Sequence, residues 1–221
     1  MTANWWTLVP LRGIAGGKSR LAPVLDAAAR AVLNRFLLVH TLGVIGQWRG
    51  DLARCLLVSP CEEALEIAHG AGALVLREQA GGLNAALAFG AAQAARRGAD
   101  KLLIVACDLP ELNADALAAL AEPAAASKHA GLAPDRAGTG TNALVVDADA
   151  ADIFAFGVDS CRRHLAAFRR ISHQSALCRR MELAFDLDTP QDHAEWLARR
   201  GARIPRAVAQ SGYHQIAEAG K

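Results

Sequence analysis

The sequence lacks several features that mark whole classes of protein. Its five cysteines are an odd number, and none stands in C-x-x-C spacing, which argues against a disulfide framework and a zinc knot. Lysine and arginine are scattered in pairs and the formal net charge is only +2, so nucleic acid is not an expected partner. No apolar run approaches the ~18 residues of a membrane span, and no basic region followed by an apolar one stands at the N-terminus. We therefore expect a cytoplasmic protein with reduced thiols and no membrane partner.

Apolar residues, by contrast, are abundant: they make up 52% of the 221 residues, enough to bury one sizeable core. Short apolar runs rich in branched side chains alternate with longer Ala- and Leu-rich stretches at helical spacing, a pattern typical of repeated βαβ units. We predict strands at residues 7–11, 55–59, 73–77, 102–107 and 143–146, and one ending at 185–187. The prediction is an α/β protein with one Rossmann-like domain over residues 1–205, a mostly parallel central sheet, helices on both faces, and a loose tail at 206–221.

Helix starts have recognisable signals. Asp26, Asn113 and Thr189 are side chains that can cap a helix, and Pro190 suits the first helical position after Thr189. A further helix is expected to open at Gly81-Gly82, and another to run from residue 160 to about 170.

A glycine-rich loop, residues 11–20, follows the first predicted strand. Glycines such as Gly13 and Gly17 let backbone N–H groups approach phosphate oxygens closely. Arg12, Lys18 and Arg20 add positive charge, which predicts a cradle for a triphosphate. The alternative is an ordinary glycine-rich turn with solvated charges.

A second alternative for this loop is the Walker A motif of P-loop kinases, since Gly17-Lys18-Ser19 has the ending of one. That motif requires four residues between its glycines, whereas Gly13 and Gly17 have three between them, and the position six before Lys18 is Arg12. The spacing therefore argues against a P-loop.

Three aspartates come where predicted strands end. Asp108 closes the strand at 102–107, and Asp186 and Asp188 stand two apart, so that both can face one side of an extended segment while Leu187 faces the core. Ligands of open α/β sheets bind beyond the carboxyl ends of the strands, and carboxylate oxygens suit Mg²⁺. Asp108 could instead serve a turn, and Asp188 a helix start.

These residues belong to blocks that together resemble one family. The blocks are Lys-Ser-Arg-Leu (18–21), Gly-Gly-Leu-Asn (81–84), Asp-Leu-Pro (108–110), Pro-Asp-Arg-Ala-Gly-Thr-Gly-Thr-Asn-Ala-Leu (134–144), Phe-Gly-Val-Asp-Ser (156–160) and Asp-Leu-Asp-Thr-Pro (186–190). In this order they resemble the CofC/FbiD family of guanylyltransferases, which act on 2-phospho-L-lactate, phosphoenolpyruvate or 3-phospho-D-glycerate in coenzyme F-420 biosynthesis. The resemblance implies a GT-A-like nucleotidyltransferase domain that binds GTP, a small phosphorylated acid and Mg²⁺.

The resemblance also implies a role for individual residues. Asp108 and Asp186 would hold magnesium, and Lys18 and Arg20 the nucleotide phosphates. Leu83 and Asn84 would lie near the nucleoside. Thr141, Gly157 and Ser160 would bind the acceptor. The family's first loop commonly has Pro-x-Lys where this chain has Pro10-Leu11-Arg12, so the role of Arg12 stays open.

Taken without the family, the acceptor blocks are less specific. The Gly/Thr pairs at 138–142 offer close backbone approach and two hydroxyls, but a tight β-turn would have the same sequence. Ser160 could form an anion site or be a plain N-cap. Arg163, one turn further on, is expected to contact the acceptor; for His164, contact and a solvated helix face both stay open.

The reaction expected is attack by an acceptor phosphate oxygen on the α-phosphorus of GTP, with release of pyrophosphate and no covalent enzyme intermediate. The rivals are a nucleotidyltransferase for a molybdopterin or sugar phosphate, and a nucleotide-binding module without catalysis. A homodimer is compatible with the sequence, which leaves the oligomeric state open.

Overall fold

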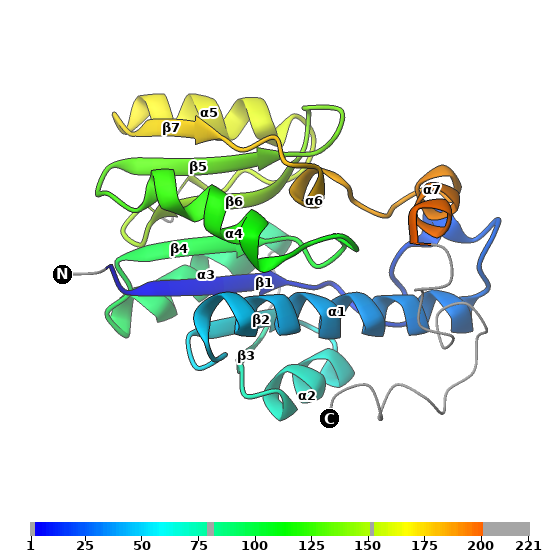
Figure 1. Cartoon of the computed structure of the whole chain (residues 1–221). Coiled ribbons are helices and arrows are strands. Elements are labelled where there is room, and N and C mark those ends of the chain that lie inside the picture. Colours follow the sequence, from blue (N-terminus) through cyan, green and yellow to red (C-terminus); the bar gives the residue numbers. More distant parts are fainter. Residues whose placement is uncertain (1–2, 79–81, 151–152, 201–221) are drawn as a thin grey trace.

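A seven-stranded sheet forms the centre of the molecule (Figure 1). The computed structural model describes residues 3–78, 82–150 and 153–200. The strands are β1 (Trp5–Pro10), β2 (Cys55–Ser59), β3 (Leu74–Arg77), β4 (Lys101–Val105), β5 (His129–Pro134), β6 (Thr141–Asp147) and β7 (Gln174–Leu177). Their order is β3-β2-β1-β4-β6-β5-β7, and β6 alone among them runs antiparallel to its neighbours. The predicted mostly parallel sheet is confirmed.

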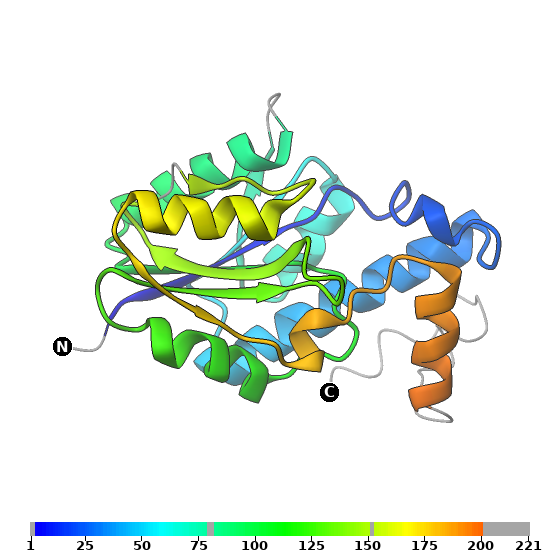
Figure 2. The ribbon, with the colours of Figure 1, turned by 90° about the horizontal axis from the view of Figure 1, so that it is seen from above.

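Helices cover both faces of this sheet, as predicted. The helices of the described residues are α1 (Ala27–Arg49), α2 (Glu62–Gly70), α3 (Gly82–Arg96), α4 (Ala114–Ala121), α5 (Ser160–Arg170), α6 (Met181–Ala184) and α7 (Pro190–Arg200), with short 3-10 turns η1 (Ser19–Leu21) and η2 (Glu122–Ala124). Figure 2 shows α1 and α4 on one face and α3 and α5 on the other. The sheet is therefore a buried middle layer.

The alternation of side chains along each strand explains why an apolar core forms on each face of the sheet. In β4, Leu103 and Val105 pack with α1 and α4, whereas Leu102 and Ile104 pack on the opposite face with α3 and α5. Successive side chains of a strand point to opposite faces, so a strand covered on both sides must be apolar throughout. This is why the buried strands appear in the sequence as continuous apolar runs.

A smaller apolar cluster lies away from the sheet and joins η1, α1 and α7. Its members are buried large side chains: Leu21, Leu33, Leu37, Phe185, Leu187 and Trp196. Burial of each such side chain contributes roughly 1.5–3 kcal/mol of transfer free energy. The cluster fixes the segment between α6 and α7 against the N-terminal part of the chain.

The predicted helix starts are found where the structure describes them. The side chain of Asp26 accepts a hydrogen bond from Ala29 N, and Asn113 accepts one from Ala116 N. Thr189 caps α7, since its Oγ1 accepts from Asp192 N at 3.2 Å. Gly82 opens α3, whereas Gly81 and the tail at 206–221 lie outside the described residues, as do residues 201–205 of the predicted domain.

Two parts of the strand prediction are wrong. Residues 185–187 form no strand, because Phe185 and Leu187 bury against α1 and α7 instead of joining the sheet. Strands β5 and β7 were not predicted. The first, HAGLAP, has no β-branched residue, and the second, QSAL, is an edge strand with half-exposed and exposed residues, so neither carries the apolar pattern of a buried strand.

One helix is long and apolar enough to span a membrane by length and composition alone. This is α1, but 56% of its most apolar window is buried inside the molecule. It packs on the sheet and against α4, as a core helix does.

Candidate active site

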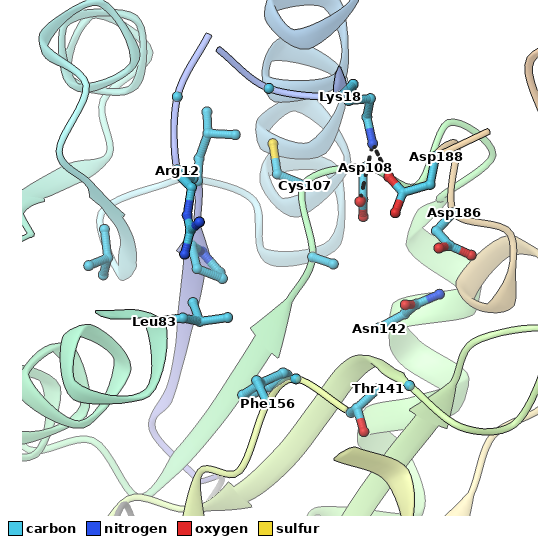
Figure 3. A pocket seen from close by; sticks show the side chains of 18 of the residues that line it. Arg12, Lys18, Leu83, Cys107, Asp108, Thr141, Asn142, Phe156, Asp186 and Asp188 are labelled. Atoms are coloured by element: carbon cyan, nitrogen blue, oxygen red, sulfur yellow. Dashed lines mark hydrogen bonds and ion pairs between the residues drawn. The ribbon is translucent and has the colours of Figure 1, made fainter. Parts of the chain in front are cut away.

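A cavity of about 670 Å³ opens at the carboxyl ends of β1, β2 and β4 (Figure 3). Its walls come from the glycine-rich loop after β1, the ends of β3 and β4, the start of α3, the start of β6, the loop before α5, and residues 186 and 188. This is the edge of a parallel sheet at which ligands of α/β proteins bind. The cavity thus brings together most of the candidate residues, which come from six segments that are far apart in the sequence.

The glycine-rich loop forms one wall. Arg12, Gly13, Gly17 and Lys18 line the cavity, whereas Arg20 is exposed and lies outside the lining. A Cβ on Gly17 would stand 2.7 Å from the side-chain nitrogen of Asn34, so a larger residue at position 17 would push the Asn34 side chain aside.

Asn34 holds this loop in place, although it was not among the candidate residues selected from the sequence. The residue is buried on α1, and its Nδ2 donates to the carbonyl of Ile14 at 2.7 Å. A polar residue within the apolar face of a long helix was the available signal, because buried polar groups need partners.

Lys18 lies between two of the candidate carboxylates. Its Nζ is 3.2 Å from Asp108 Oδ2 and 2.9 Å from Asp188 Oδ1, and only 8% of its side chain is exposed. Burial alone would lower the pKa of Lys18, but the two carboxylates raise it above its ordinary value, so the ammonium stays charged.

Asp186 is the third carboxylate and has a different environment. Burial, followed by the nearby charges of Asp108 and Asp188, raises its pKa to about 6. A cation beside this carboxyl would lower its pKa again, because a neighbouring positive charge favours the ionised form.

The segment that carries Asp186 and Asp188 is fixed by contacts with the ends of two strands. Leu187 N donates to the carbonyl of Asp108 at 3.0 Å, which ties it to the end of β4. Asn142, at the start of β6, donates through Nδ2 to the carbonyl of Leu183 at 3.0 Å. Both aspartates face the cavity while Leu187 is buried, as the spacing predicted, although the segment is not a strand.

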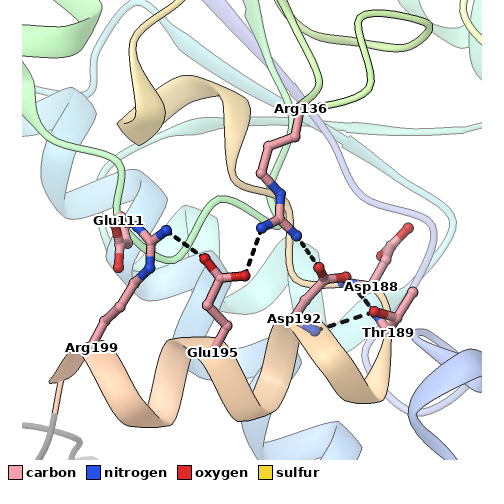
Figure 4. Close-up of polar contacts among 7 residues, drawn as sticks. All are labelled: Glu111, Arg136, Asp188, Thr189, Asp192, Glu195 and Arg199. Atoms are coloured by element: carbon pink, nitrogen blue, oxygen red, sulfur yellow. Dashed lines mark hydrogen bonds and ion pairs between the residues drawn. The ribbon is translucent and has the colours of Figure 1, made fainter.

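A network of charges on α7 secures the same segment (Figure 4). Arg136, in the loop between β5 and β6, pairs with Asp192 and with Glu195, and its guanidinium lies over the ring of Phe185. Asp192 in turn accepts from the backbone and hydroxyl of Thr189 at 2.8 Å. The β5–β6 loop and α7 are therefore joined directly beside Asp188.

Thr141, Gly157 and Ser160, which the resemblance assigns to the acceptor, all line the cavity. Ser160 is the first residue of α5, but the N-cap position belongs to Asp159, so Ser160 is not the cap. Arg163 is exposed and outside the lining, and its Nη2 is 3.5 Å from the carbonyl of Phe156.

Leu83 also lines the cavity, whereas Asn84 stands behind its wall. The side chain of Asn84 accepts from Phe156 N at 2.8 Å and donates to Phe156 O at 3.1 Å, so it holds the loop before α5. His164 is fully buried, and neither a solvated face nor contact with a ligand describes it. Sequence reasoning also missed Glu78, which lines the cavity at the end of β3.

The charged residues of the cavity lining indicate whether the site suits a metal ion. Five carboxylates face the cavity (Glu78, Asp108, Asp135, Asp186 and Asp188) against the two cations Arg12 and Lys18. Within the described ranges, no three acidic, histidine or cysteine side chains converge closely enough to hold a metal by themselves. Mg²⁺ commonly binds through one or two carboxylates with substrate phosphates completing its shell, so the donor set fits that ion.

Cys107 lines the cavity next to Asp108 but is not an activated nucleophile. Burial raises the pKa of its thiol to about 12, so the sulfur stays protonated at neutral pH.

Comparison with known proteins identifies the family to which this arrangement belongs. Residues 6–202 match the family model described as guanylyl transferase CofC like. The chain belongs to this family. It is 40% identical to the phosphoenolpyruvate guanylyltransferase of Rubrobacter xylanophilus, over 90% of this chain and 96% of that protein. It is 38% identical to the 3-phospho-D-glycerate guanylyltransferase of Phenylobacterium zucineum, over 85% and 87% of the two chains.

Solved structures agree on the fold. A nucleotide-diphospho-sugar transferase, so described, from Desulfovibrio desulfuricans superposes with a TM-score of 0.73 at 16% identity, over 90% of this chain and 89% of that one. A nucleotidyl transferase from Methanothermobacter superposes with a TM-score of 0.64 at 16% identity, over 89% and 97%. This CofC-like chain is thus an enzyme of the nucleotidyltransferase fold, as the resemblance implied.

Proposed function

We propose that this chain transfers GMP from GTP to a small phosphorylated carboxylic acid and releases pyrophosphate. The observation that carries the proposal is one cavity lined by Lys18, Asp108 and Asp186 together with Thr141 and the start of α5. The relatives act, by their names, on phosphoenolpyruvate or 3-phospho-D-glycerate. We propose one of these acids, or 2-phospho-L-lactate, as the acceptor.

In the proposed reaction an oxygen of the acceptor phosphate attacks the α-phosphorus of GTP. The new P–O–P bond forms as the bond from the α-phosphorus to the bridging oxygen breaks, and pyrophosphate leaves. The acceptor phosphate is already ionised near neutral pH, so no residue need remove a proton. Lys18 and backbone N–H groups of the loop after β1 orient the triphosphate and offset charge on it.

We propose Mg²⁺ as the cofactor, with Asp108 and Asp186 as its protein ligands. Bound there, the ion would neutralise charge on the phosphates. The excess of carboxylates over cations in the lining supports this, because a triphosphate and a phosphorylated acid would otherwise meet a negative surface. Asp188 makes the shorter contact with Lys18, at 2.9 Å against 3.2 Å for Asp108, which supports a role for Asp188 in placing the lysine.

The end of the cavity beneath β2 and β3 suits a purine. Val58, Leu83 and Ala86 provide apolar surface there, and Glu78 provides a carboxylate that makes no ion pair with another described residue. A carboxylate accepts hydrogen bonds only, and guanine offers two donors, N1–H and the 2-amino group, on one edge. Adenine has an acceptor at N1. Glu78 therefore supports the preference for GTP.

We also propose that the reaction serves coenzyme F-420 biosynthesis in the cytoplasm, in keeping with the family and with five free cysteines.

The decisive test of the reaction is pyrophosphate release with GTP and Mg²⁺, offering the three acids in parallel, with ATP and CTP as controls. Release with one acid identifies the acceptor. If folded protein that binds GTP releases no pyrophosphate with any of the three acids, the proposal is overturned. The chain would then use another acceptor, such as a molybdopterin or sugar phosphate, or be a non-catalytic module.

A further inference from the structure

His164 makes two hydrogen bonds inside the wall of the cavity, and each goes to a different segment. Its Nδ1 is 3.0 Å from Thr141 Oγ1, at the start of β6. Its Nε2 accepts from the backbone N–H of Ala155 at 3.0 Å. The imidazole is fully buried, and its ring centre is 4.7 Å from that of Phe156 in an edge-on contact.

The second of these bonds determines which ring nitrogen carries the proton. A backbone N–H can only donate, so Nε2 of His164 must be the unprotonated nitrogen. In a neutral imidazole the proton then lies on Nδ1, which donates to Thr141 Oγ1. Burial and the neighbouring Arg163 lower the pKa of His164 to about 4, so the ring is neutral at physiological pH.

The tautomer has a consequence for Thr141. The hydroxyl oxygen of Thr141 accepts a hydrogen bond from His164, so the hydroxyl proton of Thr141 is not used in that contact. This proton is available for a hydrogen bond to an oxygen of the phosphorylated acid. Thr141 lines the cavity beside Gly157 and Ser160. A hydroxyl whose proton is free suits an anionic oxygen, because such an oxygen accepts hydrogen bonds only.

We propose that His164 is the positioning residue of the acceptor site: through the Nδ1–H tautomer it makes Thr141 a hydrogen-bond donor to the phosphorylated acid and fixes the loop at residues 155–157. The inference rests on the proposed function, which it deepens. His164 lies outside the lining of the cavity, so it would act on the acceptor only through Thr141 and this loop. Asn84 holds the same loop from α3 through Phe156, so the loop is fixed from two sides before the acceptor binds.

A kinetic comparison separates this role from a general structural one. His164→Leu removes both hydrogen bonds, whereas His164→Asn can keep an amide N–H near the position of Nδ1. We expect His164→Leu to raise the KM for the acceptor roughly tenfold or more, the loss typical of a hydrogen bond to a charged group, while the KM for GTP changes less than about twofold. His164→Asn should recover part of the loss. Equal increases in both KM values would overturn the proposal.

A double-mutant cycle tests the link between the two side chains. Thr141→Val removes the hydroxyl at nearly constant volume, so adding His164→Leu to it should raise the acceptor KM by clearly less than the same substitution does in the wild type. Full additivity of the two effects would mean that His164 does not act through Thr141. His69→Asn, at an exposed site on α2, is the matched histidine control.

The tautomer can be measured without turnover. In ¹⁵N-labelled protein, the ring nitrogens of His164 should show a proton on Nδ1 and none on Nε2, with the signals assigned by their loss in His164→Asn. A proton on Nε2 would overturn the inference whatever the activity. Absence of pyrophosphate release by the wild type with every acid would instead overturn the proposed function, and the acceptor role of Thr141 with it.

Discussion

Lys18 and Asp188 lie 170 positions apart in the chain, and their side chains meet at 2.9 Å between Nζ and Oδ1. Asp108 shares the same ammonium at 3.2 Å. The contact connects the glycine-rich loop after β1 to the segment before α7, in the lining of the cavity (Figure 3). Lys18 is thus held in place by carboxylates before any phosphate enters.

Replacement of Lys18 tests the charge at this point. We expect Lys18→Met to lower kcat/KM for GTP by roughly 10²–10³-fold, because a positioned positive charge beside the phosphates is lost. Steady-state pyrophosphate release measures this. Lys128→Met, at an exposed lysine next to the amino end of β5, is the control. An effect of similar size in both variants would contradict the role given to Lys18.

Asp186→Asn should separate activity from stability. The substitution removes the proposed magnesium ligand and should abolish turnover. It also removes a carboxylate whose pKa the folded protein raises to about 6, so the metal-free variant should be more stable than the wild type above pH 6, by about 1 kcal/mol once partial solvent screening is counted. Because the unfolded carboxyl titrates near its ordinary pKa of 3.8, this gain should shrink as the pH falls below 6 and vanish below 3.8, where both states become protonated.

Thermal unfolding of wild type and variant across that pH range, without divalent ions, checks the stability difference. Turnover of Asp186→Asn at the wild-type rate would refute the assignment of Asp186 to the metal.

Arg136→Met should weaken the attachment of α7. The guanidinium is partly buried and pairs with Asp192 and Glu195, so we expect a loss of roughly 1–3 kcal/mol in unfolding free energy, together with reduced turnover as Asp188 loses its support. Chemical denaturation and pyrophosphate release report the two effects. Arg180→Met is the matched control, since Arg180 pairs with Glu182 at the surface and should matter much less.

Glu78→Gln should relax the choice of base. The amide keeps the size of the side chain but presents a donor as well as an acceptor, so it can pair with adenine as readily as with guanine. We expect the ratio of kcat/KM for GTP over ATP to fall by roughly tenfold or more, with the acceptor KM unchanged. An unchanged ratio would mean that the base is selected elsewhere.

The buried imidazole of His164 predicts a pH dependence of stability. Its folded pKa of about 4 lies below the ordinary value of 6.5, so the unfolded chain takes up a proton that the folded chain excludes. Stability should be fully present above pH 6.5 and fall by up to about 3 kcal/mol as the pH drops to 4. Chemical denaturation of wild type and His164→Asn across this pH range checks the prediction. The variant should lose this part of the pH dependence of stability, and an identical pH dependence in the two proteins would contradict the prediction.

Several parts of the molecule could be predicted because their causes are local. The runs at β1, β2 and β4 are apolar throughout since both faces are covered, and Asp26 and Asn113 are caps whose partners lie three residues away. Glycines at 13 and 17 carry the same kind of local information. The spacing of Asp186 and Asp188 even gave the correct orientation without the correct secondary structure.

Other features depend on partners far along the chain. Asn34, Glu78 and His164 were missed or left open, because nothing near them in the sequence shows that they meet Ile14, the end of the cavity or Thr141. Arg20 and Arg163, which share motifs with cavity residues, lie outside the lining.

The sequence by itself determined the α/β class, the edge of the sheet at which chemistry belongs, and the family, since periodicity, caps and motif order are properties of short segments. Tertiary structure decided which charges meet. The pairing of Lys18 with both Asp108 and Asp188, and the neutral tautomer of His164, arise only when strands and loops distant in sequence pack together and exclude water. The energies of charge pairs and hydrogen bonds depend on distance and burial, and neither distance nor burial can be read from the order of residues alone.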